Sequence, residues 1–110
     1  MRELRGGAVA DICHDLVATP SEYGDEELLA DLVEARVRAI GARYERIGNA
    51  LVCRTGEGAD AETTALVGHL DTVPNWAGGG VERTAERIVG RGAADMKGGV
   101  AVMLALLERL

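Results

Sequence analysis

The run Thr64–His69 constrains the fold of this 110-residue chain more than any other segment. It is almost continuously apolar and ends in a histidine. Such a run is typical of a strand that is covered on both faces, and strands of this kind lie in sheets flanked by helices. Helical patterns precede it at residues 9–17 and 25–41, and another follows shortly after Asp95. The sequence therefore predicts the opening half of an α/β domain.

The predicted helices are defined by apolar side chains that recur at the i, i+3, i+4 spacing of one helix face. In order along the chain, these stripes are Val9, Ile12, Cys13, Leu16 and Val17; Leu29, Leu32, Val33, Val37 and Ile40; and Val100, Met103, Leu104, Leu107 and Leu110. The first stripe leaves Asp11, His14 and Asp15 on the solvent side. We interpret the acidic run 25–27 as a helix start, where negative charge meets the positive helix end, rather than as metal ligands.

Short strands are predicted on both sides of the apolar run. Arg43–Ile47 and Ala50–Arg54 flank a Gly48-Asn49 turn, and Val81–Arg83 and Arg87–Val89 are spaced to pair as a hairpin.

Composition excludes several classes of protein. The formal net charge is −6, from 18 acidic and 12 basic residues, and the arginines do not cluster, so nucleic-acid binding is not expected. The apolar stretches are too short to span a membrane, and residues 1–7 do not resemble a signal peptide, which predicts a cytoplasmic protein. Cys13 and Cys53 are far apart without zinc-ligand spacing, and we interpret them as buried thiols.

The residues with catalytic chemistry gather in a glycine-rich region, since eight of the 15 glycines lie between Gly68 and Gly99. In the motif Gly68-His69-Leu70-Asp71-Thr72-Val73-Pro74, His69 and Asp71 are two residues apart and can project together from extended backbone. A neutral imidazole is a good zinc ligand, and a neighbouring carboxylate can fix its orientation. A histidine at a strand end beside a turn-forming aspartate is the alternative.

A second motif, Gly90-Arg91-Gly92-Ala93-Ala94-Asp95-Met96-Lys97-Gly98-Gly99, precedes the last helix. Asp95 can serve as its N-cap. The glycines of the first helical turn oppose helix formation, however, and so indicate a close backbone approach to another group. The motif lacks the arrangement of a phosphate-binding loop.

Together these motifs resemble the zinc metallopeptidase family of aminoacylases, glutamate carboxypeptidases, acetylornithine deacetylases and succinyl-diaminopimelate desuccinylases. The segment Pro20-Ser21-Glu22-Tyr23-Gly24-Asp25-Glu26 is similar to an opening motif of that family. The spacing from residues 72–74 to Asp95 is most similar to the actinobacterial desuccinylases, although neighbouring deacylases share the same motifs.

The resemblance implies a role for each matching position. His69 would bind one metal ion, Asp71 would hold its imidazole as a catalytic residue, and Asp95 would bridge two divalent ions, Zn²⁺ or Co²⁺. We therefore predict that these three side chains converge at one rim of the sheet. The peptide bond Asp95–Met96 is expected to be cis. The family also needs a Glu-Glu pair and a second histidine downstream, which residues 96–110 do not contain.

The implied activity is metal-dependent hydrolysis of an N-acyl amide, with N-succinyl-LL-2,6-diaminopimelate as the expected substrate. An N-acetylornithine deacetylase, a dipeptidase or a carboxypeptidase is the alternative within the family. The fold class implied is α/β, with residues 1–110 forming the N-terminal portion of the mixed-sheet, helix-covered catalytic domain of a zinc-dependent exopeptidase-like fold. The chain ends inside a helical pattern and is expected to be part of a longer, homodimeric enzyme that acts on a small N-acylated amino acid.

Two readings of another class stay open. The chain could bind metal, or only a partner chain, without catalysis, and His69 and Asp95 could be no more than caps in a structural α/β fragment.

Overall fold

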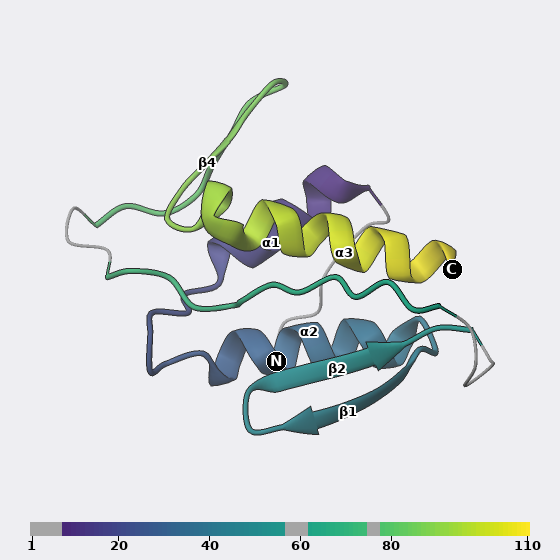
Figure 1. The fold of residues 1–110 in the computed structure, drawn as a ribbon. Helices are drawn as coiled ribbons and strands as arrows, with labels where there is room; N and C mark the ends of the chain where they lie inside the picture. The colour runs from purple at the N-terminus through teal and green to yellow at the C-terminus, as the bar shows by residue number, and fades with distance from the viewer. Residues whose placement is uncertain (1–7, 57–61, 75–77) are drawn as a thin grey trace.

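Helices supply the buried core of the computed structural model, which describes residues 8–56, 62–74 and 78–110 (Figure 1). The helices α1 (Val9–Ala18), α2 (Glu27–Ala39) and α3 (Gly98–Arg109) match the three predicted segments closely. α1 ends at Ala18 because Pro20 disfavours helical backbone at Thr19, the residue before it. The core is made of aliphatic side chains from all three helices, among them Ile12, Leu16, Leu29, Val37 and Leu104.

The predicted stripes are correct in their centres and wrong at some positions. Asp15, expected on the solvent side of α1, is buried, because α1 contacts α3, β4 and the turn before α3 and is thus covered on more than one side. His14 is half-buried. Val9 and Leu110, at the outer ends of their stripes, are exposed.

Both predicted hairpins are confirmed. β1 (Arg43–Ile47) pairs antiparallel with β2 (Ala50–Arg54) across the Gly48-Asn49 turn and packs on α2. β3 (Glu82–Arg83) pairs with β4 (Ile88–Val89) in a hairpin that projects from the helices in Figure 1. These pairs form two separate two-stranded sheets in the described part of the chain.

The central strand predicted at residues 64–69 is wrong. The segment runs as irregular extended chain between α2 and α3 in Figure 1, and residues 62–69 are all exposed. A strand is stabilised by the ladder it forms with a neighbour, and no other strand of the described residues lies in register with this one. The apolar side chains of the run are consequently open, with Val67 at 85% and Leu66 at 57% exposure. The described residues therefore form a mixed helix–strand arrangement without the expected sheet.

The structure also bears on the expectations about membrane-spanning helices and about the two cysteines. No helix among the residues described has the length and hydropathy to cross a bilayer. The first seven residues, interpreted above as lacking a signal peptide, lie outside the described residues. Cys13 is buried and Cys53 half-buried, and both are free thiols whose pKa is raised by burial.

Candidate functional site

The extended segment that carries His69 and Asp71 is fixed at its C-terminal end. Thr72 forms a parallel bridge with Glu22, in which the Thr72 amide donates to Ser21 O at 2.9 Å and the Tyr23 amide donates to Thr72 O at 3.0 Å. The chain between α1 and α2 thus lies beside the end of the segment that carries His69 and Asp71.

The glycine-rich motif before α3 forms a tight turn, η1 (Ala93–Lys97), which is interrupted by non-helical backbone at Asp95 and Met96. Gly92 begins the turn with a φ of +80°, a backbone conformation that residues with a side chain rarely adopt. The Gly92 carbonyl accepts a hydrogen bond from the Lys97 amide at 2.8 Å. The Asp95–Met96 peptide bond is cis, as expected from the resemblance.

His69, Asp71 and Asp95 converge, as predicted, although not at the rim of a sheet. His69 Nε2 lies 2.9 Å from Asp95 Oδ1. On the other side of the ring, His69 Nδ1 lies 3.1 Å from the Asp71 carbonyl oxygen and 3.5 Å from Asp71 Oδ1. The side chains are accessible, with exposures of 44% for His69, 40% for Asp71 and 87% for Asp95.

Both ring nitrogens of His69 face oxygen acceptors. Nε2 donates to the Asp95 carboxylate when it carries a proton, and Nδ1 donates to the Asp71 carbonyl oxygen when the proton lies there. A metal ion that replaced the proton at Nε2 would leave the Nδ1 proton bonded to Asp71. Two ligands of one zinc ion, each about 2.0–2.2 Å from the metal, lie roughly 3 Å apart, with the ion beside the line that joins them. The pair therefore has the chemistry of two metal ligands that share one ion.

The described residues alone do not complete a metal site. No group of three or more His, Cys, Asp or Glu side chains within residues 8–56, 62–74 and 78–110 is placed to hold an ion. A catalytic zinc ion takes three protein ligands. Within the described residues, His69 and Asp95 are therefore two candidate ligands without a third.

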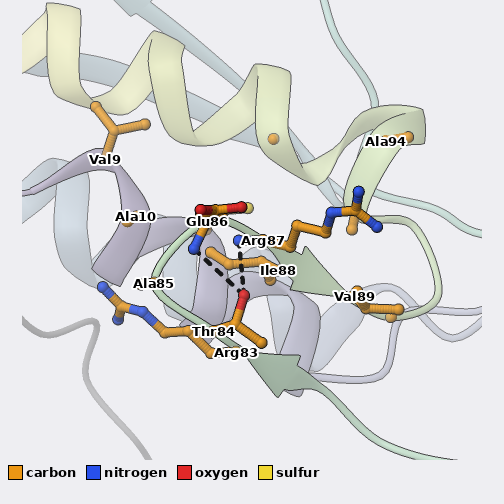
Figure 2. Close-up of a pocket in the computed structure, with 14 residues that line it drawn as sticks. Val9, Ala10, Arg83, Thr84, Ala85, Glu86, Arg87, Ile88, Val89 and Ala94 are labelled. Atoms are coloured by element: carbon orange, nitrogen blue, oxygen red, sulfur yellow. Dashed lines mark hydrogen bonds between the residues drawn. The ribbon is translucent and has the colours of Figure 1, made fainter.

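The pair lines a cavity of about 650 Å³ that also includes Thr72, Glu82 and Arg91. A larger cavity, of about 730 Å³, lies between the start of α1, the β3–β4 hairpin and the start of α3 (Figure 2). The β3–β4 hairpin forms one wall of this cavity, and in its turn Thr84 Oγ1 accepts hydrogen bonds from the backbone amides of Glu86 and Arg87. None of the three predicted site residues lines this larger cavity, so the candidate site is the smaller one.

Two buried polar residues beneath the site were given no role in the sequence analysis. Ser21 Oγ donates to Leu70 O at 2.6 Å, and Lys97 Nζ donates to Thr19 O at 2.8 Å. Lys97 is 2% exposed, and burial lowers the pKa of its ammonium group to about 8. The sequence does single out Lys97, because it is the only lysine beside 11 arginines and it lies inside the motif that contains Asp95.

Comparison with known proteins supports the family resemblance. The sequence profile of Peptidase family M20/M25/M40 matches residues 65–110. A Mycobacterium tuberculosis protein provisionally named as a succinyl-diaminopimelate desuccinylase is 40% identical over all of this chain and 31% of its own length. Proteins named succinyl-diaminopimelate desuccinylase from Aromatoleum aromaticum and Wolinella succinogenes are 31% and 38% identical, over 99% and 84% of this chain. The chain spans 31% and 26% of those two relatives, so it corresponds to less than a third of each.

Proposed function

We propose that this chain is part of a metal-dependent amidohydrolase of Peptidase family M20/M25/M40, whose profile matches residues 65–110. Its substrate is N-succinyl-LL-2,6-diaminopimelate, which is hydrolysed to succinate and LL-2,6-diaminopimelate. The names of the relatives support this substrate. The observation that carries the proposal is the 2.9 Å approach of His69 Nε2 to Asp95 Oδ1, with the opposite ring nitrogen facing Asp71.

Each residue has a distinct task in this proposal. His69 binds one divalent ion through Nε2, and Asp71 holds the imidazole in the tautomer that leaves Nε2 free. Asp95 would hold the same ion and a second one, for which its 87% exposed side chain leaves room. When bound, a pair of Zn²⁺ or Co²⁺ ions acidifies a water molecule and polarises the amide carbonyl.

The rest of the catalytic machinery lies outside these 110 residues. A general-base glutamate, a second histidine and further carboxylate ligands are required, and no described side chain completes the pair. We propose that residues 1–110 are the N-terminal portion of an exopeptidase-like catalytic domain, in a cytoplasmic enzyme that forms a homodimer.

The test is hydrolysis by the complete gene product, purified without metal and then loaded with Zn²⁺ or Co²⁺. We expect succinate release from N-succinyl-LL-2,6-diaminopimelate, and much slower hydrolysis of N-acetylornithine and of dipeptides. Faster hydrolysis of N-acetylornithine or of a dipeptide would support the proposed amidohydrolase activity but contradict the proposed substrate. Absence of hydrolysis of all three by metal-loaded protein would reject the activity, and calorimetry with Zn²⁺ would then show whether the protein only binds metal.

A further inference from the structure

The chain between α1 and α2 lies directly beneath the candidate site. We call residues 19–23 the brace. Its Ser21 is 1% exposed, and the Ser21 hydroxyl donates to Leu70 O, between the two site residues His69 and Asp71. The bridge between Glu22 and Thr72 adds two backbone hydrogen bonds on the same side. The brace therefore fixes the segment that carries His69.

The brace is also bonded to the turn that carries Asp95. Lys97, two residues after Asp95, donates from Nζ to Thr19 O in a buried contact. Thr72 and Lys97 meet over Gly92, where an added Cβ would lie 2.5 Å from Thr72 Cγ2 and 3.4 Å from Lys97 Cε. The segment that carries His69 and the turn that carries Asp95 are the two arms of the site. Both arms thus pack on one support, which consists of the brace and Lys97.

The support is buried whereas the site is open. An exposed pair such as His69 and Asp95 gains little from its own attraction, so that attraction alone does not fix the distance between them. Buried hydrogen bonds are costly to leave unmade and do define a geometry. We propose that Ser21 and Lys97 are positioning residues that set the separation of His69 and Asp95 for metal binding; this rests on the function proposed above.

The experiment measures binding of Zn²⁺ and Co²⁺ alone to the complete gene product by calorimetry, together with the visible absorption of the Co²⁺ form. Ser21→Ala and Lys97→Met should each weaken binding about 10–100-fold, as loss of a ligand's supporting contacts does, and should alter the Co²⁺ spectrum. Because Lys97→Met keeps the length of the side chain, it gives an independent result if Ser21→Ala does not fold.

Thr19→Val is the matched control. The Thr19 hydroxyl donates to Asp15 O, back into α1, in a buried bond that does not join the two arms, and the carbonyl that accepts from Lys97 is unchanged. This variant should lower the unfolding midpoint of the metal-free protein about as much as Ser21→Ala does, yet keep the parent's metal affinity and spectrum.

Two results would overturn the inference. If His69→Ala loses a metal ion while Ser21→Ala and Lys97→Met bind like the parent, the positioning role is wrong and the proposed function stands. If the parent binds no ion, or binds equally well with His69→Ala, the proposed function falls and the positioning role falls with it.

Discussion

Lys97 should make the stability of the metal-free protein depend on alkaline pH. Its ammonium group is buried, and the pKa is lowered from 10.5 to about 8 because burial penalises the charged form. The perturbation is Lys97→Met, which removes the titrating group and keeps an unbranched side chain of similar length.

The direction follows from which state holds the proton. Below about pH 8, Lys97 is charged in both the folded and the unfolded chain, and the full penalty of the buried charge is present. Between pH 8 and 10.5 the folded chain releases the proton first, so the unfolded state binds more protons and the free energy of unfolding rises with pH. At 1.36 kcal/mol for each pKa unit, the gain between about pH 7 and pH 10 is roughly 2.5 kcal/mol.

Denaturant unfolding of the complete, metal-free gene product at both pH values measures this gain. The parent protein and Lys97→Met are compared at each pH, because other groups titrate in both proteins and cancel in the difference. The parent should gain roughly 2.5 kcal/mol relative to the variant at the higher pH. A difference that stays constant, or that moves against the parent, would refute the argument that Lys97 is held in a desolvated position.

Further predictions concern the site, the turn and the isolated chain. His69→Ala should abolish one metal site in calorimetry, whereas Asp71→Ala should lower turnover more than metal occupancy, since the Asp71 carboxylate lies beside the imidazole, 3.5 Å from His69 Nδ1. Gly92→Ala should destabilise by roughly 1–3 kcal/mol more than Gly41→Ala in denaturant unfolding: both glycines have positive φ, but only at Gly92 would the new Cβ clash, with Thr72. Residues 1–110 expressed alone should melt without a sharp transition or aggregate, because exposed aliphatic side chains each forgo roughly 1.5–3 kcal/mol of burial; a soluble monomer with a cooperative melt would contradict this.

Local pattern predicted the local structure. The three helices and both hairpins follow from side-chain spacing and turn residues, which act over a few positions. The strand predicted at residues 64–69 is wrong because strand formation depends on residues distant in sequence. Apolar side chains show what a strand could bury, but pairing depends on a neighbour that the segment itself does not specify, and the described residues supply none in register.

The candidate site was predicted in part for a similar reason. The motifs indicated that His69, Asp71 and Asp95 meet, and they do. Their metal and catalytic roles stay predictions. The contacts beneath them, from Ser21 and Lys97, join positions far apart in the sequence, and no local spacing reveals such a partnership.

The sequence distance spanned by the brace bears on the order in which the chain acquires structure. Its bonds to Leu70 and Lys97 span 49 and 78 residues of sequence, whereas each helix and hairpin forms from neighbours. Closing a long loop costs chain entropy before its contacts are gained, so contacts distant in sequence tend to be made late. The helices and hairpins should therefore form first, and His69 and Asp95 should meet only in the last steps of folding. A chain released early from synthesis would then be helical before His69 and Asp95 have met.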